Sequence, residues 1–64
     1  MYRVDGFKTK AEADNFKKQN GGVVLWDKRT PTGRETAIAK DYRIATQATG
    51  IDRTKYPYVV ERRV

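Results

Sequence analysis

The longest uninterrupted apolar run in the chain, Val23–Trp26, is the feature that most constrains its fold. Turn-forming residues flank it, with Asn20-Gly21-Gly22 before it and Thr30-Pro31-Thr32-Gly33 after it. A short run of β-branched and aromatic residues is typical of a strand. Because both pleat faces of this run are apolar, we predict that 23–27 is a central strand with a neighbour on each side.

The residues before this run predict one strand and one helix. Tyr2–Asp5 alternates apolar and polar residues, which indicates a short half-buried strand that ends at Gly6. Thr9–Glu12 fits a capping box, so a helix should begin there and run for roughly ten residues. Phe16 is the only large apolar residue of this helix, and we expect it to anchor the helix to the sheet.

The segment from Thr36 to Thr49 has two interpretations. As a helix it places Ile38, Tyr42 and Ala45 on one face, while as a strand it places Ile38, Tyr42 and Ile44 on one side. We prefer a helix over 37–49, because the segment holds four alanines and Thr36 is a good N-cap. Gly50 followed by Ile51 is also typical of a helix end.

Residues 56–63 predict the last strand, with Pro57 at its start or on a sheet edge because proline cannot donate to a strand ladder. The chain is then one small basic α+β domain, residues 1–64, of order β-α-β-α-β. We expect a three-stranded sheet with two helices packed on one face. The other face would then expose either Val23 and Leu25 or Val24 and Trp26. The predicted hydrophobic cluster consists of Phe16, Leu25 or Trp26, Ile38, Tyr42 and Val60.

The composition argues against an enzyme. The 64 residues include no cysteine, histidine or serine, so the commonest nucleophiles, general base and metal ligands are missing. The eight carboxylates are dispersed and mostly stand beside basic residues, which is typical of surface ion pairs. We therefore expect no catalytic site, no metal and no cofactor. No apolar run approaches the roughly 20 residues that span a bilayer, and the first residues lack a signal-peptide core. We expect a cytoplasmic protein with no membrane partner.

The net charge of +6, from 14 Lys and Arg against 8 Asp and Glu, favours an acidic partner. That partner is nucleic acid or an acidic protein surface. A charge of this size in a small domain also serves solubility alone. The basic residues are scattered along the chain, so any basic patch must be made by the fold.

Aromatic residues interleaved with basic ones are the main functional signal. Such aromatics form either a stacking platform for nucleic acid or the core of a small protein. We expect the loops after the second strand and before the third to lie at opposite ends of the sheet, joined by a strip on the second helix. The alternative is a protein-interaction module that forms a homodimer or docks on a larger protein. The candidate nucleic-acid-binding residues are Trp26, Lys28, Arg29, Arg34, Lys40, Arg43, Arg53 and Lys55.

Three segments together, Gly6–Ala13, Gly21–Thr30 and Lys55–Val60, resemble a group of small proteins encoded on integrative conjugative elements of Gram-positive bacteria. The resemblance covers most of the chain. It implies a mobile-element setting and supplies no activity and no catalytic residue. The first segment alone is similar to the strand-to-helix junction of the DNA-arm-binding domain of tyrosine integrases. That domain has three strands ahead of its helix, whereas only one fits before Thr9 here.

Overall fold

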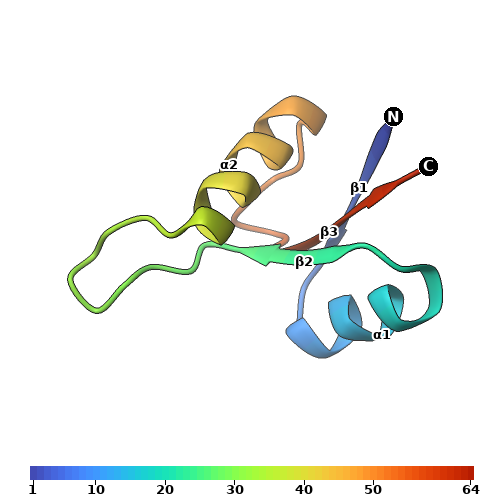
Figure 1. The fold of residues 1–64 in the computed structure, drawn as a ribbon, viewed down its shortest axis with the longest axis horizontal. Coiled ribbons are helices and arrows are strands. Elements are labelled where there is room, and N and C mark those ends of the chain that lie inside the picture. Colours follow the sequence, from blue (N-terminus) through green and yellow to red (C-terminus); the bar gives the residue numbers. More distant parts are fainter.

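The computed structural model describes all 64 residues and contains three strands and two helices (Figure 1). The order is β-α-β-α-β, as predicted, and the fold is α+β. The residues between β2 and α2 and between α2 and β3 form the two long connections. The elements are β1 (Tyr2–Phe7), α1 (Lys10–Asn20), β2 (Val23–Trp26), α2 (Ala37–Thr49) and β3 (Tyr58–Arg63).

The sheet has the strand order β1-β3-β2, and β3 is antiparallel to both of its neighbours. The central strand is therefore β3, in which Val59 and Val60 are completely buried. The prediction that Val23–Trp26 is the central strand is wrong, because β2 pairs with β3 alone and lies at an edge. Its two apolar faces are explained by a helix layer on each side of the sheet.

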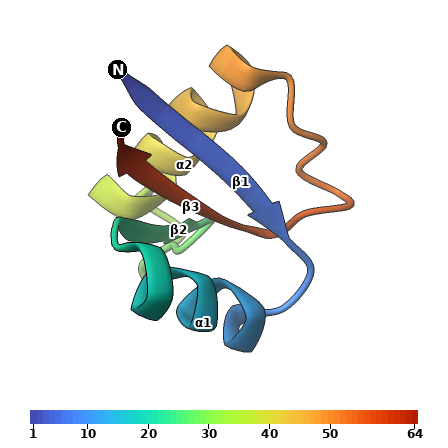
Figure 2. The ribbon, with the colours of Figure 1, turned by 90° about the vertical axis from the view of Figure 1, so that its right-hand side faces the viewer.

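The two helices lie on opposite faces of the sheet (Figures 1 and 2). On one face Ala13 of α1 packs with Val24 and Val60, and on the other Tyr42 and Ala45 of α2 pack with the alternate residues Leu25 and Val59. The predicted packing of both helices on one face is therefore wrong, and the single predicted cluster is in fact two. Consecutive apolar residues in β2 and β3 point to opposite sides, so each side needs its own cover.

We predicted that one sheet face would expose either Val23 and Leu25 or Val24 and Trp26. Because a helix covers each face, neither pair is exposed. Leu25 and Val24 are buried, and Trp26 is half-buried. Val23 alone remains 56% exposed, at the end of β2 that pairs with Glu61.

The helix α1 begins where the capping residues predicted it. The Thr9 hydroxyl accepts a hydrogen bond from the Glu12 N–H at 3.2 Å. The Phe16 ring lies half-buried with its centroid 5.1 Å from that of Phe7, and the Arg62 guanidinium lies 5.3 Å from the Phe16 centroid. Ala13 is the only fully buried residue of the helix, so α1 is held mainly by aromatic packing.

The helix α2 confirms the prediction for residues 37–49. The Thr36 hydroxyl caps it by accepting from the Ala39 N–H at 3.3 Å. At its end Gly50 is left-handed, with φ 70° and ψ 20°, and the Ile51 N–H donates to the Thr46 carbonyl at 3.1 Å. This bond across the left-handed glycine is the one expected in a Schellman ending.

The first strand does not end at Gly6, as predicted, but continues to Phe7. The strand continues because Gly6 and Phe7 remain in the ladder opposite Val59 and Tyr58, and the Tyr56 ring lies against Gly6. A Cβ atom at Gly6 would stand 2.9 Å from Cγ of Tyr56, which is too close for any other residue without movement. Gly6 therefore provides room for an aromatic ring within the strand.

Candidate functional site

The two long connections meet at one end of the sheet. Because β3 is antiparallel to β2, Trp26 at the end of β2 pairs with Tyr58 at the start of β3. The connection after α2 runs back along the helix to reach this end. The Tyr42 hydroxyl, in the middle of α2, holds it there by donating to the carbonyls of Tyr56 at 2.9 Å and Arg53 at 3.4 Å. The prediction that the two basic loops lie at opposite ends is therefore wrong.

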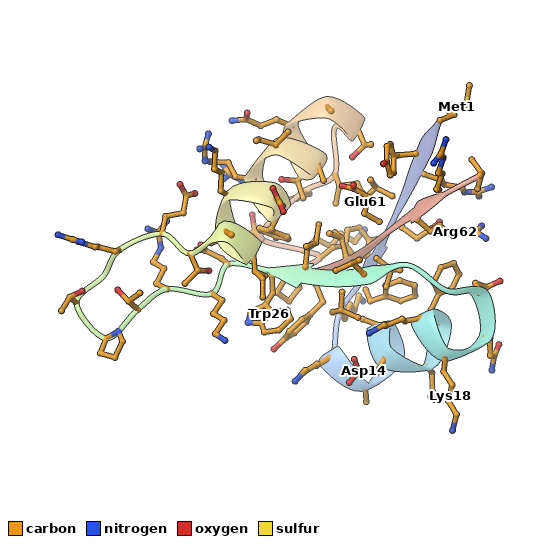
Figure 3. The ribbon with its side chains drawn as sticks, in the orientation of Figure 1. Met1, Asp14, Lys18, Trp26, Glu61 and Arg62 are labelled. Atoms are coloured by element: carbon orange, nitrogen blue, oxygen red, sulfur yellow. The ribbon has the colours of Figure 1, made fainter.

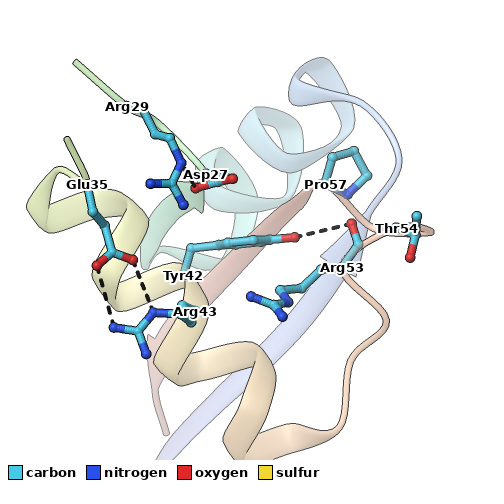
Figure 4. A pocket seen from close by; sticks show the side chains of 8 residues that line it. All are labelled: Asp27, Arg29, Glu35, Tyr42, Arg43, Arg53, Thr54 and Pro57. Atoms are coloured by element: carbon cyan, nitrogen blue, oxygen red, sulfur yellow. Dashed lines mark hydrogen bonds and ion pairs between the residues drawn. The ribbon is translucent and has the colours of Figure 1, made fainter. Parts of the chain in front are cut away.

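An open hollow of about 480 Å³ lies where these connections meet α2 (Figure 4). It brings together three of the predicted site residues, each from a different segment: Arg29 before α2, Arg43 on α2 and Arg53 after it. The full lining is Asp27, Arg29, Glu35, Tyr42, Arg43, Arg53, Thr54 and Pro57.

Two of the three arginines form ion pairs within the hollow. Arg29 Nε lies 3.3 Å from Oδ1 of Asp27. Arg43 holds Glu35 with two hydrogen bonds, Nε to Oε1 at 3.1 Å and Nη2 to Oε2 at 3.5 Å. Arg53 has no ion pair in the structure. Three guanidinium groups thus face two carboxylates, and one positive charge is left without a partner.

The pairing also shifts the ionisation of these groups. The hydrogen bond from Arg43 lowers the pKa of Glu35 below its ordinary value, and the charges of Arg43, Arg29 and Lys40 act in the same direction. The same bond raises the pKa of Arg43. Beside the hollow, hydrogen bonds from the Thr54 hydroxyl and N–H lower the pKa of Asp52. Glu35 and Asp52 are therefore ionised at neutral pH.

Residues 28–36 form a projecting hairpin, which we call the arm (Figure 1). Arg29 bridges to Glu35, and the Thr30 N–H donates to the Arg34 carbonyl at 2.9 Å. The tip is a turn in which the Gly33 N–H donates to the Thr30 carbonyl at 2.9 Å, and Gly33 has φ 85°. A turn followed by a glycine of positive φ is one of the standard three-residue hairpin loops. The sequence predicted only a loop here.

The remaining predicted residues are distributed around the hollow or lie away from it. Trp26 lies on the α1 side of the sheet, with its ring 6.2 Å from Tyr58 and the Lys10 Nζ 5.3 Å from its centroid (Figure 3). It is thus on the other face from the α2 core cluster. Lys55 Nζ stands 5.6 Å from the Tyr56 ring. Lys28 and Arg34 are exposed on the arm and Lys40 on α2.

Sequence reasoning missed the two carboxylates and the tyrosine of the hollow. Asp27 stands two residues before its partner Arg29, which is a local signal, but Glu35 and Arg43 are eight residues apart. Tyr42 was predicted as core, and it is buried, yet its hydroxyl also positions the loop that carries Arg53. Only the fold shows this second role.

The arrangement is suited to contacting anions. Guanidinium groups present several N–H donors in a plane and bind carboxylates and phosphates with two bonds at once. No three carboxylates are grouped as a metal site would need. Neither helix is long and apolar enough to cross a membrane. Comparisons with protein-family models, curated proteins and solved structures find no match to this chain.

Proposed function

We propose that this chain is a non-enzymatic binding module that contacts nucleic acid through the cations around the hollow. The observation that carries the proposal is the convergence of Arg29, Arg43 and Arg53 from three segments, with Arg53 unpaired. The mobile-element accessory role implied by the sequence resemblance is part of the same proposal. The contact residues are Lys28, Arg29, Arg34, Lys40, Arg43, Arg53 and Lys55.

The character of the hollow favours a polymeric anion over a small molecule. Small-molecule pockets are mostly apolar and enclose their ligand. This hollow is open, and apart from Pro57 its lining residues are charged or carry a hydroxyl group, with the Tyr42 ring and Pro57 as apolar surface between them. Exposed cations on the arm and on α2 extend the positive surface beyond it. A nucleic-acid backbone presents the repeated phosphates that such an extended surface requires.

Binding titrations of the intact protein against labelled single- and double-stranded DNA and RNA test the proposal. Each titration is run at about 50 and 200 mM salt, because phosphate contacts release counterions and weaken steeply over that range. We expect micromolar or tighter binding that falls with salt. Arg53→Gln should weaken binding, and the matched control is Lys18→Gln on α1, which removes the same charge away from the hollow. Absence of salt-sensitive binding to all four probes would reject the proposal.

The second candidate function is protein interaction, and one observation favours it. Large apolar side chains are exposed at the opposite end of the sheet: Tyr2 is 66%, Val23 56% and Val64 61% exposed. Tyr2 and Val23 both lie on the face that α2 covers only in part, by the register of their strands. Sedimentation equilibrium tests for a homodimer. A monomer at all concentrations up to about 100 μM would remove self-association from consideration.

A further inference from the structure

The arm is ordered by its own hydrogen bonds and contributes nothing to the two core clusters. Besides the bonds at its tip, the Thr30 hydroxyl accepts from the Arg34 N–H at 3.0 Å and shares a hydrogen bond with the Thr32 hydroxyl at 3.0 Å. At its base the Thr36 hydroxyl donates to the Lys28 carbonyl at 2.6 Å. A segment with this many internal bonds and no core role is a preformed projection.

The two faces of the arm differ in charge pairing. Arg29 and Glu35, which bridge across it, both line the hollow and are both ion-paired. Their chain neighbours Lys28 and Arg34 lie on the opposite face, because successive residues of a β-ribbon alternate. Neither Lys28 nor Arg34 has an ion pair. The paired face fixes the arm to the body of the domain, and the other face presents free cations.

We propose that the arm enters the major groove of double-stranded DNA as a two-stranded ribbon, an inference that rests on the proposed nucleic-acid binding. The major groove of B-form DNA is wide enough to admit a β-ribbon. The major groove of an RNA duplex is too deep and narrow for side chains to enter. A single strand offers no groove at all. The shape of the arm therefore selects duplex DNA among nucleic acids.

The position of the cations assigns their roles. Arg34 is next to the tip, and both its N–H and its carbonyl are fixed by Thr30. Its guanidinium is placed to contact base edges, and guanine O6 and N7 are the acceptors that arginine prefers in this groove. Lys28 stands at the base of the arm, nearer the rim of the groove, where it contacts phosphate. Arg53 and Arg43 in the hollow would then meet the backbone that borders the groove.

The first test compares the intact protein and three variants on one sequence as DNA duplex, DNA single strand and RNA duplex. We expect the DNA duplex to bind tightest. Arg34→Gln should weaken duplex binding roughly ten-fold or more, Lys28→Gln less, and the control Lys18→Gln least. The melting temperature of each variant confirms that the fold is intact, since none of the three side chains is in the core.

The second test removes one of the two major-groove acceptors of guanine, N7, and keeps O6. A G·C-rich duplex in which 7-deazaguanine replaces guanine lacks N7 and keeps its minor groove and phosphates. The intact protein should lose affinity several-fold, whereas Arg34→Gln should bind both duplexes equally. Equal binding of the two duplexes by the intact protein, or a single strand or RNA duplex that binds as tightly as DNA duplex, overturns this inference and leaves nucleic-acid binding standing. Failure of every probe rejects both.

Discussion

The two faces of the sheet are covered in different ways. The cations on the α1 face pack over aromatic rings, whereas those on the α2 face line a hollow that is open to a ligand. On the α1 face, one helix residue, Ala13, is fully buried, and half-buried aromatic rings complete the packing. On the α2 face, four helix residues are buried and the contacts are aliphatic apart from Tyr42. The α2 face is therefore the better packed of the two, and it carries the arm and the hollow.

The cations of the two faces have different partners as a result. On the α1 face, Arg62 and Lys10 lie over the rings of Phe16 and Trp26, and Arg62 Nε also stands 3.9 Å from Oδ2 of Asp5. These cations cover the half-buried aromatic rings of this face. On the α2 face Lys55 lies near the Tyr56 ring, while Arg29, Arg43 and Arg53 line the hollow. Interleaved aromatic and basic residues thus serve packing on one face and a candidate binding surface on the other.

The largest effect should come from breaking the α2 face with Leu25→Ala. Leu25 is 4% exposed and packs with Tyr42, Ala45 and Val59. Removing a buried leucine side chain costs about 2–5 kcal/mol, and a domain of this size has roughly 3–10 kcal/mol in total. Urea denaturation followed through the single tryptophan, Trp26, measures the loss. The control Leu25→Met keeps the volume and should cost less than about 1.5 kcal/mol.

Breaking the α1 face with Phe16→Ala should cost less, about 2–3 kcal/mol. Truncating a fully buried phenylalanine costs about 3–5 kcal/mol, but Phe16 is only half-buried. Phe16→Leu keeps apolar volume while removing the ring that meets Phe7 and Arg62, so it isolates the aromatic share. A loss for Phe16→Ala larger than that for Leu25→Ala would reverse the ranking of the two faces.

The sequence predicted the elements well because the signals that begin and end them are local. Thr9, Thr36 and Gly50 each act within a few residues of their own position, and each does so in the structure. Strand order failed for a physical reason. Apolar residues on both faces of a strand indicate that a layer packs above and below it. They do not indicate which strands lie beside it, because that pairing is made by backbone hydrogen bonds and does not depend on the side-chain pattern.

The three arginines of the candidate site were predictable from the sequence, but their assembly, the carboxylates that pair with them and the role of Tyr42 were not. Composition pointed to Arg29, Arg43 and Arg53, but their meeting depends on the antiparallel pairing of β2 with β3. The arm was missed because Thr30–Gly33 has turn residues without the alternating apolar flanks that usually mark a hairpin. Its hydrogen bonds come from hydroxyls and backbone, which periodicity does not detect.

A smaller effect, about 1 kcal/mol, should follow from Tyr42→Phe. The change keeps the ring in the α2 core and removes the hydroxyl that donates to the Tyr56 carbonyl. It should loosen the connection that carries Arg53, so hydrogen exchange at 52–56 should rise while exchange in α1 stays the same. An unchanged exchange pattern would show that the ring alone holds the connection in place.

The same variant has a distinct response to pH. Burial raises the pKa of Tyr42 above its ordinary value of 10.0. A raised folded-state pKa means that the stability due to the neutral hydroxyl is fully present below 10.0 and is lost as pH rises through the higher folded-state value. The wild type should therefore lose stability at alkaline pH more steeply than Tyr42→Phe. Equal alkaline profiles would contradict the burial of the hydroxyl.

The smallest effect on stability should come from Glu35→Gln. The same variant tests whether the α2 face supplies the cations that bind nucleic acid. Glu35 is solvent-exposed, and exposed ion pairs contribute little to stability. The melting temperature should therefore stay close to that of the wild type. The change removes the carboxylate that holds Arg43, so nucleic-acid affinity should rise a few-fold with the added positive charge. The matched control Glu12→Gln on α1 makes the same charge change on the other face and should leave affinity almost unaltered.

Acid should break the ion pair between Glu35 and Arg43 in the wild type, as Glu35→Gln does. The lowered pKa of Glu35 fixes the pH range in which this happens. A carboxyl whose folded-state pKa is depressed keeps its ion pair at and above its ordinary value of 4.5 and loses it as pH falls through the folded-state value. The Nε–H resonance of Arg43, followed by NMR from pH 7 to 2, should move only below 4.5 in the wild type. In Glu35→Gln it should stay constant throughout. A wild-type transition at or above 4.5 would mean that Arg43 does not hold Glu35 in solution, and Arg43 would then join Arg53 as a second unpaired cation of the hollow.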